Sequence, residues 1–258
     1  MTDISSMTGA DQFKKAPEGY RANEVRINGE TGKFEYVDLL NKKKDEKAEV
    51  RELGTEIRVA FLKVRRKLGY YDAKLKRFIQ TSEHNFKDDN VFLFGPNVKG
   101  VASELREQFE RLKTMQIVYA LLSNNGTSEP EVVKLTVKGA SLGSDNKEPS
   151  TTPFYKYLAS FSGDEHSHEY ITNLISVKEI GAKEYYCIDF KRGTKLPEDM
   201  LKFAEGKIRD IHAITTAQDR YYNVKTETEV REERQDEIAT IEYPEGAEEG
   251  INPDDIPF

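Results

Sequence analysis

The first regular pattern in the chain is an alternation of apolar and polar side chains, which is typical of half-buried strands. It covers residues 24–27 and again 34–37, with Asn28-Gly29-Glu30-Thr31-Gly32 between them. A polar, glycine-containing segment between two alternating runs predicts a β-hairpin. The charge-rich stretch 41–52 that follows predicts an exposed loop or short helix, and residues 1–20 predict a flexible polar arm.

The longest strand pattern lies within residues 55–80, and its apolar residues change once from odd-numbered to even-numbered positions. Apolar residues first occupy odd positions, 57 to 61, and then even positions, 62 to 68. A single β-bulge near Phe61–Leu62 would keep both apolar sets facing inward, because it inserts one extra residue into the alternation. Gly69-Tyr70-Tyr71-Asp72 then predicts a turn into a second strand. The outward set would be Arg58, Lys63, Arg65 and Lys67.

This stretch is also strongly basic, with aromatic residues between its charges. Lys and Arg neutralise phosphates and release counterions, whereas Tyr and Phe offer flat faces for unpaired bases. We therefore predict a nucleic-acid-binding surface that includes Tyr70 and Tyr71. The alternative is a solvated strand with aromatics in the core, which fits Phe61 and Phe78 better than the tyrosines. The segment 58–78 has one acidic residue, Asp72, and eight basic residues: Arg58, Lys63, Arg65, Arg66, Lys67, Lys74, Lys76 and Arg77.

Further elements follow from the same patterns. Apolar runs predict strands at 91–94, 115–122, 132–137, 170–177 and 184–190, and residues 139–152 predict a polar loop. Helical spacing predicts a helix over 101–112, and a second helix starts with Thr152 as N-cap and Pro153 at its first position. A third helix over 197–220 places these residues mostly on one face: Met200, Phe203, Ile208, Ile211 and Ile214.

Roughly eight strands in hairpin-like pairs, with three helices, favour a mixed, β-rich α+β fold. An OB-like antiparallel barrel with peripheral helices fits, because this fold binds single strands on one strand face. The helix over 101–112 would then lie between the third and fourth barrel strands. We predict a flexible arm (1–20), an OB-like nucleic-acid-binding domain (21–222) and a disordered acidic tail with a docking tip (223–258).

Charge separates the C-terminal end from the rest of the chain. The net charge is -7, and residues 235–258 hold eight acidic residues and no Lys or Arg, so the body is nearly neutral. Apolar residues in this segment are too sparse to offset the entropy of folding, which predicts disorder. The final Ile256-Pro257-Phe258 form a stiff apolar tip behind negative charge, which suits a basic-rimmed apolar pocket on a partner.

The closing residues Asp255-Ile256-Pro257-Phe258, extended by Asp254, resemble the C-terminal tail of bacterial single-stranded-DNA-binding proteins, an acidic run closed by Asp-Ile-Pro-Phe. The resemblance implies a docking tail that recruits replication, recombination and repair proteins to coated single-stranded DNA. It covers only these last residues. The usual DNA-binding domain and Gly/Gln/Pro-rich linker are not recognisable, which fits a divergent, for example phage-encoded, version. The alternative is an acidic solubilising tail.

Enzyme signatures are weak. There is no Walker loop or dinucleotide fingerprint, His84 and His212 are isolated, and His166 and His168 lack partners at metal-ligand spacing. The single Cys, Cys187, excludes an internal disulfide, and its place in an alternating strand pattern predicts a small buried or half-buried residue rather than a nucleophile. Without a membrane-length apolar run or an apolar signal region, we expect a soluble, cytoplasmic protein that is not an enzyme and has no cofactor or metal.

The expected function is therefore single-stranded-DNA binding by charge and stacking, with partner recruitment through the tail. One alternative is an adaptor or mimic that recruits host repair or replication proteins by its tail without binding DNA itself. Another is an RNA-binding or transcription-accessory protein. An enzyme acting on nucleic acid would need an acidic metal-binding cluster, which the sequence does not offer. The oligomeric state stays open, and a homo-oligomer is compatible with these patterns.

Overall fold

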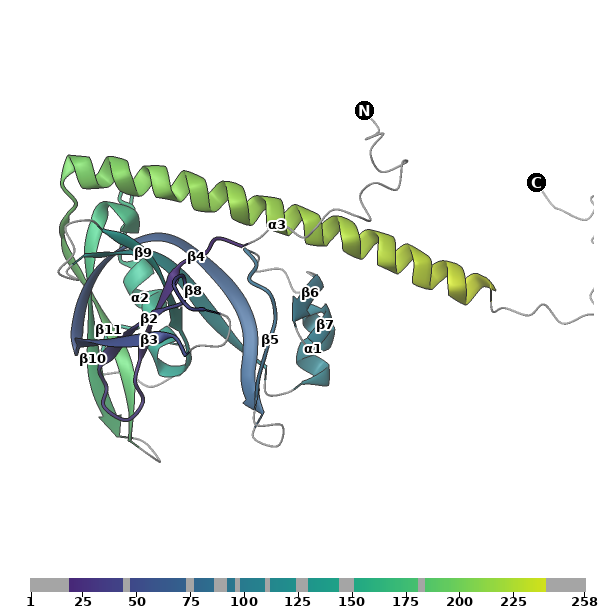
Figure 1. Cartoon of the computed structure of the whole chain (residues 1–258), viewed down its shortest axis with the longest axis horizontal. Helices are drawn as coiled ribbons and strands as arrows, with labels where there is room; N and C mark the ends of the chain where they lie inside the picture. Colours follow the sequence, from purple (N-terminus) through teal and green to yellow (C-terminus); the bar gives the residue numbers. More distant parts are fainter. Residues whose placement is uncertain are drawn as a thin grey trace, which may run out of the picture.

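The computed structural model describes residues 19–43, 47–72, 77–85, 92–95, 98–109, 112–123, 130–143, 151–180 and 184–239. Within these residues the chain forms eleven strands and three α-helices, most of them arranged around one strongly curled sheet (Figure 1). The fold is therefore mixed and strand-rich, as the alternating sequence patterns predict, and its main sheet curls into a half-barrel (Figure 1).

The curled sheet has the strand order β11-β10-β4-β8-β9-β1-β2-β3, and β5 also pairs with β4. All its pairs are antiparallel except β1 with β9, which is parallel, so the predicted wholly antiparallel barrel differs from the structure at this pair. A separate two-stranded sheet joins β6 to β7. The strands are β1 Asn23–Ile27, β2 Phe34–Asp38, β3 Glu49–Gly54, β4 Glu56–Asp72, β5 Arg77–Gln80, β6 Phe92–Gly95, β7 Val98–Val101, β8 Lys113–Ser123, β9 Glu131–Val137, β10 Tyr170–Ile180 and β11 Glu184–Lys195.

Most of the predicted strands are confirmed, including the hairpin of β1 and β2, whose turn contains Gly32 at a φ of 71°. Two predictions are wrong. The stretch 41–52 was expected to be a loop or short helix, but its residues 49–52 belong to the edge strand β3, because their backbone pairs with β2 while their side chains stay exposed. Residues 69–72 were expected in a turn but continue β4, where each pairs with a residue of β5.

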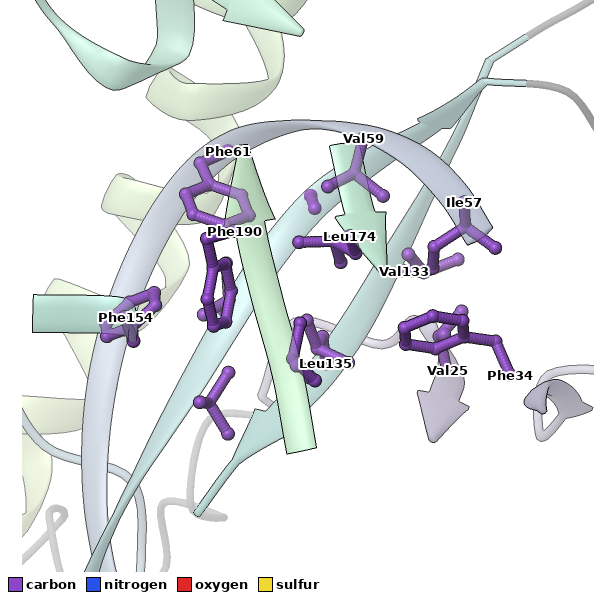
Figure 2. Packing of buried hydrophobic residues seen from close by; sticks show 14 of the residues in the cluster. Val25, Phe34, Ile57, Val59, Phe61, Val133, Leu135, Phe154, Leu174 and Phe190 are labelled. Carbon is purple, nitrogen blue, oxygen red and sulfur yellow. The ribbon is translucent and has the colours of Figure 1, made fainter. Parts of the chain in front are cut away.

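The main core fills the concave side of the sheet. Figure 2 shows β4 arching over this core, with Ile57, Val59 and Phe61 pointing into it. Aromatic rings gather at one end, where Phe154 and Phe190 lie 5.4 Å apart between ring centroids. Phe154 belongs to the short helix α2 (Phe154–Ala159), whose N-cap is Pro153 rather than the predicted Thr152. The Thr152 backbone N–H instead donates to Asp189 Oδ1.

The convex side of the sheet is covered by α3 (Glu198–Ala239), which crosses β4 and continues past the curled sheet (Figure 1). Ala204 and Ile211 of α3 pack on an outer apolar cluster formed with β4 and β8. Leu62, predicted to face inward, belongs to this outer cluster because it is the extra residue of the bulge. The helix extends well beyond the predicted end at residue 220.

The remaining helix, α1 (Ala102–Gln108), confirms the predicted helix in part and follows the β6–β7 ribbon. Its Leu105 lies in a third apolar cluster, with Leu68 of β4 and Ile79 of β5. Among the described residues, no helix combines the length and the apolar character needed to cross a membrane.

Candidate nucleic-acid interface

β4 carries most of the predicted nucleic-acid-binding residues, and its bulge decides which way each one points. The register with β8 shifts between Phe61 and Lys63, which confirms the predicted bulge. Because successive strand side chains alternate between the two faces, Arg66 and Tyr70 lie on the concave face. The convex face receives the set predicted to point outward together: Arg58, Lys63, Arg65 and Lys67.

On the convex face, Arg65 is enclosed by protein groups. Its side chain has no exposed surface, and its guanidinium donates to both carboxylate oxygens of Asp219 on α3, at 2.7 and 3.1 Å. It also donates to the Glu83 backbone carbonyl and to Asn85 Oδ1, at 2.6 and 3.1 Å. Planar guanidinium and carboxylate groups match in this bidentate arrangement. In this structure Arg65 holds α3 on the sheet.

Two other convex lysines also contact protein groups. Lys63 Nζ lies 3.0 Å from His212 Nδ1 and donates to Thr215 Oγ1 at 2.9 Å, both on α3. Lys67 Nζ donates to Gln80 Oε1 at 2.8 Å. Burial lowers the pKa of both lysines, and for Lys63 the charge of Arg65 lowers it further. Of the predicted convex set, Arg58 alone is largely exposed.

A carboxylate balances this buried positive charge. Glu83 accepts hydrogen bonds from Tyr119 Oη at 2.6 Å and from Lys134 Nζ at 3.1 Å. Burial by itself would raise the pKa of Glu83, but the Lys134 charge and the Tyr119 hydrogen bond lower it. Arg65 Nε has no hydrogen-bond partner among the described residues and lies 3.7 Å from Glu83 Oε2. On the convex face, the positive charges of Arg65 and Lys134 are therefore paired with the carboxylates of Glu83 and Asp219.

The concave face carries a row of polar side chains across neighbouring strands, which we call the polar row: His84, Arg66, Gln116 and Tyr155. Arg66 is directly opposite Gln116 of β8 and exchanges two backbone hydrogen bonds of 2.8 Å with His84. Gln116 is buried and donates from Nε2 to Tyr155 Oη at 2.8 Å. Tyr155, on α2, keeps 39% of its surface exposed.

The polar row separates two apolar clusters that share the same face of β4. Val64, two residues before Arg66, packs against the main core, and Leu68, two residues after it, lies in the cluster with α1. Within the part of the chain that the structure describes, Arg66 has no ion-pair partner. Burial lowers the pKa of the neighbouring His84, as do the charges of Arg65 and Arg66, so that imidazole is neutral at pH 7.

The other predicted site residues are placed only in part. Tyr71 lies in β4 and Arg77 in β5, opposite Asp72. Lys74, Lys76 and the predicted docking tip 254–258 lie outside the described residues. The structure thus divides the predicted set between two sheet faces and does not bring it together on one.

Sequence patterns missed two members of the polar row. Gln116 interrupts an otherwise apolar strand, which was the available signal, and Tyr155 lies among the aromatic residues of α2. Another basic run, Lys191-Arg192-Gly193, lies in β11. Arg192 is paired with Glu165 at 3.0 Å, and this pairing lowers the pKa of Glu165 to about 2.

In the described ranges, no three His, Cys, Asp or Glu side chains converge in a way that could hold a metal ion. Comparison of the chain with protein-family models, curated proteins and solved structures found no match.

Proposed function

We propose that this chain binds single-stranded DNA and recruits replication, recombination or repair proteins through its acidic C-terminal end. The observation that carries the proposal is the closing run Asp254-Asp255-Ile256-Pro257-Phe258, which resembles the docking tail of bacterial single-stranded-DNA-binding proteins. The role requires no catalytic group, cofactor or metal, and it fits a divergent, phage-type protein acting in the cytoplasm.

The fold supports this proposal without depending on the tail. A curled, strand-rich sheet is consistent with an OB-like barrel, in which a sheet face binds unpaired strands. Arg58 and Arg66 on β4 offer positive charge from opposite faces of that sheet. α3 ends at Ala239, beyond the curled sheet (Figure 1).

Fluorescence polarisation of a labelled oligo-dT with the full chain tests the proposal. We expect binding at low ionic strength and a steep loss of affinity as salt rises, with a logarithmic slope of about 0.7 per contacted phosphate. An RNA oligomer of the same length serves as the comparison. Tighter binding to RNA would assign the chain to RNA instead, and no binding to oligo-dT at low salt would refute the DNA-binding half of the proposal.

The second candidate is an adaptor that carries the tail but does not bind DNA. One observation favours it: Lys63, Arg65 and Lys67 have protein partners, which reduces the positive charge offered to phosphates on the convex face. In that case the chain would ignore oligo-dT and still capture tail-binding proteins.

A further inference from the structure

The polar row lies at a position where apolar side chains would stabilise the fold more. Its neighbours along β4 belong to two apolar clusters, and a purely apolar strand face would join them into one core. Burying polar groups destabilises a fold unless hydrogen bonds or solvent compensate. Gln116 reaches Tyr155, but the guanidinium of Arg66 has no ion-pair partner in the described part of the chain.

The row also has the chemistry that an unpaired DNA strand needs. Tyr155 offers an exposed ring, held by the Gln116 hydrogen bond at its hydroxyl and by the ring of Phe154, 5.9 Å away. Arg66 supplies positive charge opposite Gln116, the residue that contacts Tyr155, and Lys156 is exposed next to Tyr155 on α2. Burial lowers the pKa of His84, so the positive charge of the polar row comes from Arg66.

We propose that an unpaired DNA strand binds at the polar row, with a base stacked on Tyr155 and a phosphate held by Arg66. This assignment rests on the proposed function and specifies where on the fold it is performed. Gln116 acts as a positioning residue, because it fixes the Tyr155 ring from the neighbouring strand. The convex cations Lys63 and Arg65 are thereby assigned to holding α3 rather than DNA.

Paired substitutions in the full chain test this assignment by oligo-dT polarisation. Tyr155→Ala should weaken binding about five- to 150-fold, the range for one lost base stack, whereas Tyr155→Phe should retain most of the affinity because the ring remains. Arg66→Gln should weaken binding and reduce the salt slope by about 0.7.

Each change has a matched control elsewhere on the surface. Tyr185→Ala removes a tyrosine of similar exposure, 42%, from β11, and Arg209→Gln removes an exposed arginine from α3. Both controls should bind oligo-dT like the unaltered chain. Circular dichroism and thermal unfolding of each variant would identify any loss of affinity that comes from unfolding.

A measurement on the unaltered chain avoids the folding question altogether. Photocrosslinking to an oligonucleotide containing 5-iodouracil, followed by trypsin and mass spectrometry, should modify the peptide 148–156, which contains Tyr155. Two results would overturn the assignment and leave DNA binding intact. One is crosslinks confined to other peptides. The other is normal binding by Tyr155→Ala and Arg66→Gln together with weakened binding by Arg58→Gln. Failure of the unaltered chain to bind oligo-dT would instead reject the proposed function itself.

Discussion

At the scale of single residues, Arg65 and Arg66 show how neighbours of the same type acquire different roles. Because side chains alternate along the strand, Arg65 lies on the convex face, where its guanidinium donates hydrogen bonds to Asp219 and to the Glu83 carbonyl. The next residue, Arg66, lies on the concave face, opposite Gln116. The physical consequence is that a change at Arg65 acts first on stability, whereas a change at Arg66 acts first on the exposed surface.

The Arg65–Asp219 pair gives a direct stability test. Asp219→Asn removes the negative charge that faces a fully buried guanidinium, and loss of one partner from a buried pair typically destabilises by about 3–5 kcal/mol. Urea unfolding followed by circular dichroism measures this loss. The control is Asp210→Asn, an exposed position on the same helix, which should change stability little. Equal effects of the two substitutions would show that Asp219 contributes no more than a surface charge.

At the scale of elements, α3 is held on the sheet by a narrow apolar stripe. Ala204, Ile208, Ile211 and Thr215 recur at helical spacing and face β4 and β8. The stripe expected from the sequence was rotated slightly, since Phe203 is 40% exposed. The difference has a packing reason: small Ala204, fully buried, lets the helix backbone approach the sheet closely.

A matched pair of isoleucines tests how much this stripe contributes. Ile211→Ala opens a cavity beneath α3, where the side chain is fully buried, and should cost about 2–5 kcal/mol in unfolding free energy. Ile180→Ala makes the same chemical change where the residue is 83% exposed, so its effect should be close to zero. Chemical denaturation of both variants gives the comparison. Similar midpoints for the two would mean that α3 is not packed as described.

At the scale of the whole molecule, charge is divided between the sheet and the end of the chain. The sheet presents Arg58 and Arg66 from its two faces, while the last eight acids lie after residue 235. Opposite charges on one chain attract most strongly at low salt, where screening is weak. We therefore expect the acidic segment to compete with DNA for the basic surface.

Removal of residues 240–258 leaves α3 intact and takes away most of the acidic segment. The shortened chain should bind oligo-dT severalfold more tightly than the full chain at low salt, and the difference should shrink as salt rises. Phe258→Ala is the control, because it keeps every acidic residue and should leave DNA affinity unchanged. Polarisation titrations at two salt concentrations measure both. Unchanged affinity of the shortened chain at low salt would exclude the competition.

Local patterns predicted much of the fold correctly. The β1–β2 hairpin, the bulge in β4 and the buried Cys187 follow from alternation and turn chemistry within short segments. Errors arose where a distant partner decides the outcome. β3 is a strand because β2 pairs with it, and Gly69-Tyr70 stay extended because β5 and β8 lie alongside.

The candidate site shows the same limit more sharply. The parity of β4 indicated that Arg65 and Lys67 share a face, but not that α3 would cover it. Tyr155 and Gln116 are 39 positions apart, and only the folded sheet brings them into hydrogen-bond contact with each other. A pattern within one segment contains no information on which distant side chain will lie opposite.

By itself the sequence determined the strand-rich class, the bulge in β4 and the acidic, apolar-tipped end, because these depend on residues close together in the chain. Only the tertiary structure decided which sheet face α3 covers, and therefore which arginine is buried and which faces the polar row. The reason is physical. Alternation fixes two faces, but whether a face is solvated depends on apolar contacts between residues as distant as Leu62 and Ile211.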